Sequence, residues 1–192
     1  MLTAALGRAG WSVTEVHGPS NGQMGAAIGA FGDALADSPG ASALVYACGY
    51  GVGYERRLFL LPTSANLARE TDVLTAGVVG AAVTGPVARS KVSAGLVALD
   101  LVALDLVALA GAAPVAAESA QLRSAAPRTG VVAVVNAVGG PAAPTGLASA
   151  LAGALGQPSV TVSELLAGLQ RSLAGSGCRR RCRAILARWR GC

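Results

Sequence analysis

The sequence has little charge, few aromatic side chains and almost no lysine. Charged residues make up 13% of the 192 residues and aromatic residues 4%, whereas hydrophobic residues reach 53%. Lys91 is the single lysine, and the other basic residues are arginines. This bias, together with the high Ala and Gly content, is typical of a GC-rich genome and carries no functional signal by itself. We expect a core of small aliphatic side chains with few aromatic anchors.

Cysteine and histidine, on which metal sites and thiol catalysis depend, are scarce. There are four cysteines and one histidine, His17. Cys48 lies in an apolar segment and the other three cysteines lie close together in a basic tail, which is not a disulfide framework. The arginines around those three would repel a cation, so we predict no metal site and no cofactor. A reduced, cytoplasmic chain is the expectation.

Long apolar runs free of charge are also absent. The most hydrophobic window, 92–117, is long enough to cross a bilayer but contains Asp100 and Asp105. Each carboxylate costs about 2.5–3.5 kcal/mol near the centre of a membrane. The N-terminal segment has neither an early basic region nor a long apolar core, so we recognise no signal peptide there. We therefore predict that the window is buried protein interior.

The positive charge is concentrated near the end of the chain. The formal net charge is +5, and the run "CRRRCRAILARWR" holds much of it. We divide the chain into a domain over 1–175 and a basic Cys/Arg-rich tail over 176–192. The tail is either a solvated segment or a basic helix with Ile185, Leu186 and Trp189 on one side, suited to an anionic surface. Specific nucleic-acid binding is not predicted.

Helical periodicity is clearest in the first forty residues and near the end of the domain. Apolar residues at three-four spacing predict a helix over 2–9, and Ser20 with Gln23 has the spacing of a capping box before a second helix that ends near Asp37. Between them, "WSVTEV" alternates as a strand does. Further helices are predicted at "GLASALAGAL" and, after a capping box of Thr161 and Glu164, at "LLAGLQRSL".

Continuous apolar runs of strand length separate these helices. They are "SALVYA", "RLFLLP", "GLVALDLV" and "GVVAVVNA", whereas "DVLTAGVVGAAV" is weakly helical because it contains two glycines. Strands interleaved with helices predict an α/β sheet with helices on both faces. In such sheets functional groups lie at the carboxyl ends of the strands. The glycine-rich loop expected after Ala47 and the loop after Val102 are therefore the candidate sites.

The order of these segments resembles the caspase-like cysteine peptidases, particularly bacterial metacaspase-like domains. In that family a strand delivers a Gly-His-Gly loop, an extended segment ending in Leu-Pro follows, and the next strand ends in Asp-x-Cys. Here "ALVYACGYGV", "RLFLLPTSA", "GLVALDLV" and "VVAVVNAVGG" occur in the matching order, within a resemblance that covers about 1–175. No single motif is intact, so the resemblance depends on the order of the segments.

The resemblance implies which positions correspond to the family's site. Gly49 and Gly51 match the two glycines, and Tyr50 stands where the general-base histidine belongs. Asp100 matches the aspartate, which in the family helps to bind a basic residue, and Val102 stands where the nucleophilic cysteine belongs. Because "ALDLV" is repeated, Asp105 and Val107 give an alternative register that also lacks a cysteine.

The substitutions remove the chemistry of a cysteine peptidase. The thiolate is the nucleophile and an imidazole must activate it, whereas a valine has no nucleophile and a tyrosine is a weak base at neutral pH. The resemblance thus implies a pseudo-peptidase with a binding or regulatory role, acting through a protein partner or as a homodimer. An active cysteine-type endopeptidase using Cys48 as a displaced nucleophile, with His17 as its base, and an interaction module built on the basic tail are the alternatives.

Four residues have plainer structural interpretations. Cys48 is expected to be small and buried at a strand end, and His17 to be a solvated turn residue. Tyr50 and Tyr54 are loop aromatics that either cap the sheet or hydrogen-bond a ligand in the cleft.

The fold implied by the resemblance is a three-layer α/β/α sandwich with a mostly parallel caspase-like sheet that lacks the first central strand. In the family this strand precedes the first helix, with which the present sequence begins. A missing central strand would leave unpaired backbone groups that are costly to bury. The chain could be a fragment or have a mis-assigned start, pair the neighbouring strands directly, or take a strand from a partner.

Overall fold

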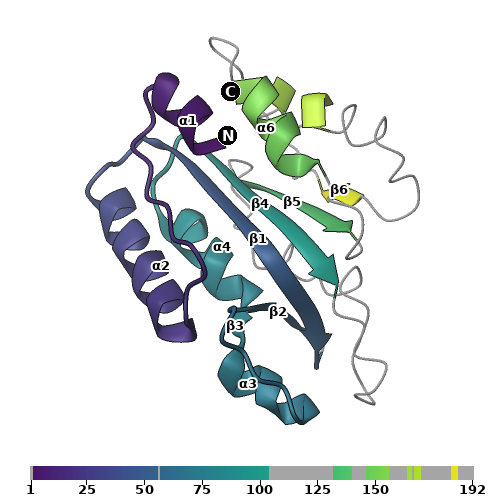
Figure 1. Cartoon of the computed structure of the whole chain (residues 1–192). Coiled ribbons are helices and arrows are strands. Elements are labelled where there is room, and N and C mark those ends of the chain that lie inside the picture. Colours follow the sequence, from purple (N-terminus) through teal and green to yellow (C-terminus); the bar gives the residue numbers. More distant parts are fainter. Residues whose placement is uncertain are drawn as a thin grey trace.

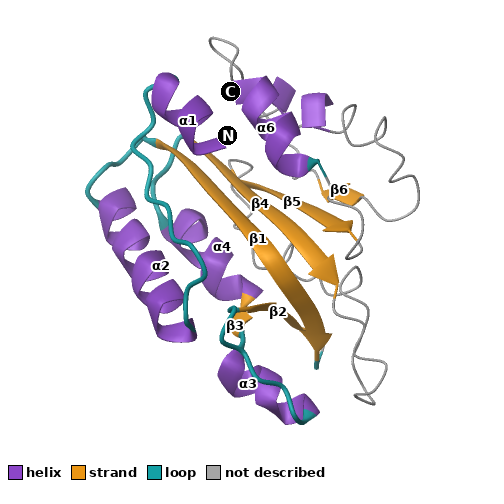
Figure 2. Cartoon of the chain, viewed as in Figure 1, coloured by secondary structure: helices purple, strands orange, loops and turns teal. Residues whose placement is uncertain are grey.

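A six-stranded mixed sheet forms the centre of the structure, with helices on both of its faces (Figures 1 and 2). The computed structural model describes residues 2–55, 57–103, 132–139, 146–155, 164–165, 167–169 and 183–185. The strands follow the order β3-β2-β1-β4-β5-β6. Their bounds are β1 (Ser42–Tyr54), β2 (Arg57–Leu61), β3 (Val78–Val79), β4 (Ala94–Ala103), β5 (Val132–Gly139) and β6 (Arg183–Ile185).

Parallel pairing is confined to the middle of the sheet. β1 pairs with β4 and β4 with β5 in parallel, whereas β2, β3 and β6 are added antiparallel. The α/β class is confirmed, but the sheet is mixed rather than mostly parallel. β1 and β2 are antiparallel because they are joined by a hairpin, which needs no crossover helix.

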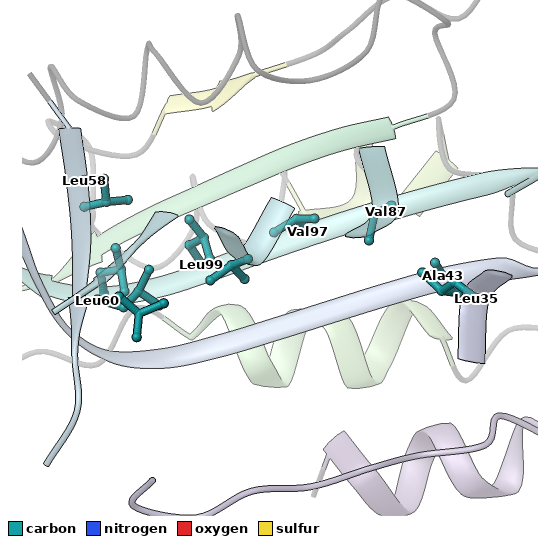
Figure 3. Close-up of a cluster of buried hydrophobic side chains, with 10 residues drawn as sticks. Leu35, Ala43, Leu58, Leu60, Val87, Val97 and Leu99 are labelled. Carbon is teal, nitrogen blue, oxygen red and sulfur yellow. The ribbon is translucent and has the colours of Figure 1, made fainter. Parts of the chain in front are cut away.

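Different helices cover the two faces of the sheet. Their bounds are α1 (Leu2–Arg8), α2 (Asn21–Ala36), the 3-10 turn η1 (Glu70–Asp72), α3 (Val73–Ala76), α4 (Gly80–Arg89) and α6 (Leu147–Leu155). Val97 and Leu99 of β4 belong to a core cluster with α2 and α4, which Figure 3 shows. Leu96 and Ala98 belong to a second cluster with α6, against which α1 packs. Neighbouring residues of a strand point to opposite faces, so the two clusters lie on opposite sides of the sheet.

The two N-terminal helices are confirmed, and their ends have local causes. The Ser20 hydroxyl accepts a hydrogen bond from the Gln23 backbone N–H at 3.3 Å, and the Gln23 side chain accepts one from the Ser20 N–H at 2.9 Å. This capping box satisfies backbone donors that the first turn of α2 leaves free. α1 is followed by Gly10, whose φ of +83° is a left-handed conformation that glycine adopts without strain.

Two predicted elements are wrong or altered. Residues 11–16 are extended but form no strand, because alternation makes a strand only where a neighbouring chain accepts its hydrogen bonds. The predicted helix over 72–83 is divided into α3, β3 and α4, with the break at Gly77. A Cβ at this position would lie 2.8 Å from the Val73 carbonyl oxygen, so the close turn requires glycine.

The expected glycine-rich loop is part of a strand. β1 continues through Gly49, Tyr50 and Gly51 to Tyr54, and positions 50–54 pair with β2 on one edge of β1. Positions 42–51 pair with β4 on the other edge. The polypeptide therefore turns after Tyr54, several residues later than predicted, where Glu55 has a positive φ of 46°.

The two edges of β1 differ in how far they are paired. The β4 edge is paired from Ser42 to Gly51, but β2 pairs only from Tyr50 onward. Within the part of the chain that the structure describes, no strand pairs with the second edge over 42–49. We call this stretch the open edge of β1.

The basic tail is described at three residues only. Arg183–Ile185 form β6, antiparallel to β5, so the interpretation of Ile185 as part of a basic helix is wrong. Leu186 and Trp189 lie outside the described residues, as do Thr161 and the alternative register of Asp105 and Val107. Among the described helices, none is both long and apolar enough to cross a membrane.

Candidate site at the carboxyl ends of β1 and β4

Two adjacent parallel strands bring the predicted site positions together. Cys48 pairs with Asp100, and Tyr50 pairs with Val102, as direct register partners of β1 and β4. Register partners on adjacent strands lie on the same face of a sheet, and the alternation along β1 places Tyr46 on this face as well. The positions lie at the carboxyl ends of the two strands, where α/β sheets carry their sites.

The best-defined interaction in the site joins the two strands through side chains. The Tyr46 hydroxyl donates a hydrogen bond to Asp100 Oδ2 at 2.8 Å in a partly buried position. Burial, followed by the hydrogen bond and negative charge of Asp100 and a smaller effect of the Cys48 thiol, raises the pKa of Tyr46 well above its usual value. Tyr46 is therefore a neutral donor at physiological pH, and Asp100 is held toward β1.

Tyr46 is the site residue that sequence reasoning missed. It lies inside the continuous apolar run "ALVYA", where no polar alternation indicates which residues face one side of the sheet. The available signal was the two-residue spacing from Tyr46 to Cys48 and Tyr50, which places all three on one face once the run is known to be a strand.

Tyr50 is presented to solvent rather than packed. Its exposed fraction is 51%, the largest among the described large hydrophobic and aromatic side chains that are exposed. A phenol on a strand offers a ligand both a hydrogen-bond donor and an acceptor. Tyr54, the other predicted aromatic ligand residue, is half-buried against the cluster of Val52, Phe59, Leu61 and Val73. Tyr54 is therefore a packing residue.

The glycines beside Tyr50 have two different structural causes. Gly49 has a φ of +153°, which side-chain-bearing residues rarely adopt. Gly51 is buried, and a Cβ there would lie 2.9 Å from Leu101 Cδ1 of the neighbouring strand. The backbone of β1 is thus shaped by glycine on both sides of Tyr50, which lets β1 pack closely on β4.

Cys48 is exposed, not buried as expected. The reason is its place near the carboxyl end of β1, on the open edge, where β2 does not yet cover the strand. Its thiol lies on the same face as Asp100 and Tyr46 and contributes to the environment of the Tyr46 hydroxyl. The side chain is therefore accessible to reagents from solvent.

His17, the proposed alternative base, has a different partner. Its Nε2 lies 3.3 Å from Glu15 Oε1, and its side chain is 84% exposed, as expected for a solvated residue. Among the interactions of the described residues, none joins His17 to Cys48. Over the same residues no group of three or more Cys, His, Asp or Glu side chains is arranged to hold a metal ion.

The comparisons with known proteins give no family. The chain matches no protein-family model, and no curated protein is significantly similar to it. The chemistry available to the site is that of its own residues. They are the exposed phenol of Tyr50, the exposed thiol of Cys48, and the Asp100 carboxylate that accepts a hydrogen bond from a second phenol.

Proposed function

We propose that the chain is a catalytically inactive caspase-like protein that binds a peptide segment of a partner at the ends of β1 and β4. The observation that carries this proposal is the register pairing of Tyr50 with Val102 on adjacent parallel strands. In caspase-like peptidases these two positions would hold the histidine and the cysteine. A base and a nucleophile must lie within reach of each other to act together, and neighbouring strand ends meet that requirement.

The residues at these positions support binding without turnover. Hydrolysis by a cysteine peptidase requires a thiolate at the nucleophile position, which valine does not supply. Tyr50 offers a hydrogen-bonding phenol to solvent, and the Asp100 carboxylate lies two residue pairs further into the sheet. A peptide crossing the strand ends would meet both groups.

The fold supports the proposal at the level of its layers. Helices α2 and α4 cover one face of the sheet and α1 and α6 the other, which is compatible with the three-layer α/β/α arrangement of the caspase-like family. No described strand pairs with the open edge of β1, the edge at which the first central strand of the family would be expected.

Fluorogenic peptides test the inactive assignment. Purified protein incubated with peptides carrying Arg, Lys or Asp before the reporter group is expected to release no reporter above the buffer rate. Installing the dyad with Tyr50→His and Val102→Cys together is expected to produce slow hydrolysis that iodoacetamide abolishes. Turnover by the unmodified chain that a thiol alkylator removes would overturn the proposal.

Peptide binding tests the positive half of the proposal. A non-hydrolysable fluorescent peptide containing arginine is expected to bind, and Tyr50→Ala is expected to weaken that binding about tenfold, since a buried hydrogen-bonded aromatic contact contributes about 1–2 kcal/mol. Leu74→Ala is the matched control, because Leu74 is a comparably exposed side chain on α3. Equal binding by both variants contradicts a site at Tyr50.

Cys48 keeps one alternative open, because its thiol is exposed within the site. If Cys48 were a displaced nucleophile, the unmodified chain would hydrolyse one of the peptides and Cys48→Ala would remove that activity. His17→Ala separates the proposed dyad from a lone thiol: an activity that depends on Cys48 but not on His17 eliminates the dyad.

A further inference from the structure

The open edge of β1 is a part of the sheet where no pairing strand is described. Over 42–49 the strand pairs with β4 on one side and with no described strand on the other. Successive residues of a strand direct their N–H and C=O groups alternately to the two sides, so about half of the residues in this stretch present both groups to the open edge. An unpaired row of this kind is a template for another strand.

The open edge also lacks the charged residues and proline that commonly keep strands from pairing. Its sequence, "SALVYACG", contains no lysine, no other charged residue and no proline. Natural edge strands are commonly protected by charges, by proline or by a covering element. The stretch is instead as apolar as an interior strand.

Burial along the open edge is incomplete on both faces. Val45 and Ala47 pack only partly against the α2 and α4 side, and Leu44 and Tyr46 only partly against the α1 and α6 side. Their register partners in β4, from Leu96 to Leu99, are exposed by 3% or less. The lower burial is therefore found on both faces and on one strand, which is consistent with β1 having β4 as its one described neighbour in the plane of the sheet over 42–49.

An extended segment lies beyond the open edge. Residues 12–17 are exposed and form no helix or strand, and none of their backbone groups takes part in the described backbone–backbone hydrogen bonds. Figure 1 shows the connection from α1 to α2 running on the side of β1 opposite to β4, and Figure 3 shows the same order from another direction. Its far end is held where Thr63 Oγ1 donates to the Gly18 carbonyl at 3.1 Å.

We propose that the open edge of β1 accepts an extended, apolar segment of about eight residues from a partner protein, which becomes an additional strand of the sheet. The N–H and C=O groups along the open edge require a strand as their partner, because only an extended chain repeats donors and acceptors at the same spacing. The occupant is apolar at successive positions, since helices cover both faces and a strand between them is buried on both.

A single extended segment matches this edge better than the edge strand of a second folded copy. α1 and α2 flank β1 on the two faces, and the connection 11–20 runs outside the open edge (Figure 1). A folded copy would have to bring its own helices into the same place. The open edge ends next to Tyr50 and includes Tyr46 and Cys48 of the candidate site, but the inference is argued from backbone pairing and does not depend on the proposed peptidase ancestry.

Peptide binding with amide hydrogen exchange tests the inference. The probe is a fluorescein-labelled peptide of eight alternating valine, leucine and alanine residues between paired lysines. Saturable binding is expected, with exchange in residues 42–49 slowed at least tenfold and exchange in β4 unchanged. A peptide of the same length in which two central residues are replaced by proline lacks two backbone N–H donors. It is expected to bind at least tenfold more weakly.

A variant of the protein gives an independent measurement. Val45→Lys places a charge on the open edge and is expected to abolish binding, whereas Leu74→Lys on the exposed face of α3 leaves it unchanged. Far-ultraviolet circular dichroism shows whether each variant is folded. If Val45→Lys does not fold, the proline peptide still tests the same contact in the unmodified chain.

Two results overturn the inference. Equal binding of the two peptides shows that no strand ladder forms. Amides over 42–49 that are as protected in the free chain as those of β4 show that the edge is already covered. If that protection disappears on dilution, the occupant is a second copy, and if it persists, the occupant is another segment of the same chain.

Discussion

β1 and β4 are neighbouring, largely apolar strands with a very different degree of burial. They pair residue for residue from Ser42 opposite Ala94 to Gly51 opposite Ala103. In β4 the side chains from Leu96 to Leu99 are almost fully buried, whereas their β1 partners are half-buried. Among the described residues, β4 has a strand on each edge, whereas β1 has β4 as its one neighbouring strand over 42–49.

The difference shows that the neighbours of a strand, not its hydrophobicity, set its burial in this sheet. Both strands are continuous apolar runs, which predict burial on both faces. Helices cover the faces of both, but a side chain is also covered by residues on the adjacent strands. Removing one adjacent strand exposes both faces of β1 at once.

Leucine truncation gives the largest expected effect and compares the two strands directly. Leu44 and Leu96 are register partners on the same face, half-buried and 3% exposed respectively. We expect Leu96→Ala to lower the free energy of unfolding by about 2–5 kcal/mol, and Leu44→Ala by roughly half as much, because less apolar surface and a smaller cavity are involved. Urea unfolding followed by circular dichroism measures both, and equal losses would remove the distinction between the strands.

Alanine at the two glycines beside Tyr50 tests how closely β1 approaches β4. Gly51→Ala places a Cβ 2.9 Å from Leu101 Cδ1 inside the core and is expected to cost about 1–3 kcal/mol of stability. Gly49→Ala meets no atom within 4 Å but must adopt a φ of +153°, with an expected cost of about 1–2 kcal/mol.

A second substitution in β4 separates the two causes. Leu101→Val removes the Cδ1 atom that the new Cβ approaches, so it should reduce the cost of Gly51→Ala and leave that of Gly49→Ala unchanged. The comparison is a double-mutant cycle of unfolding free energies. Equal coupling at both glycines would mean that backbone conformation, not contact with β4, determines both positions.

The hydrogen bond between the strands gives the smallest expected effect and depends on pH. Tyr46→Phe removes the donor to Asp100 and is expected to cost about 1–2 kcal/mol near neutral pH. The pKa of Tyr46 is raised in the folded chain, so its contribution is complete below pH 10.0, the unfolded value, and falls as the pH rises above it. The stability difference between the unmodified chain and Tyr46→Phe should therefore shrink from pH 9 to pH 11.

The matched control is Tyr50→Phe. Tyr50 is exposed, and no hydrogen bond of its hydroxyl is among the described interactions, so removal of the hydroxyl should leave the stability nearly unchanged. An equal slope above pH 10 for Tyr46→Phe and the unmodified chain would contradict the role given to Tyr46.

Apolar runs predicted the strands well because their length and composition are local properties. β2, β4 and β5 lie where the runs predict them, and the capping box located the start of α2. The strand predicted at 11–16 did not form, since a strand also needs a partner that its own sequence does not encode. The loop predicted around Tyr50 is strand for the converse reason, because β2 and β4 pair with its glycines.

The site was predictable in position but not in composition. The carboxyl ends of two apolar runs located Tyr50 and Asp100, and the structure brings these strand ends together. The bond between Tyr46 and Asp100 joins residues 54 apart in the sequence and depends on the register of two strands. The exposure of Cys48 likewise follows from where β2 begins to pair.

The divided pairing of β1 has a consequence for the order of folding. Its last part, from Tyr50, closes a hairpin with β2 across a turn of a few residues, and such hairpins form within microseconds. Its first part has only β4 as a partner, and parallel pairing across more than forty intervening residues is slow because a long loop must close first. Residues 42–49, which have one described neighbouring strand in the folded chain, are therefore also expected to pair last. Until β4 has been synthesised and docked, they remain an exposed apolar segment of the nascent chain.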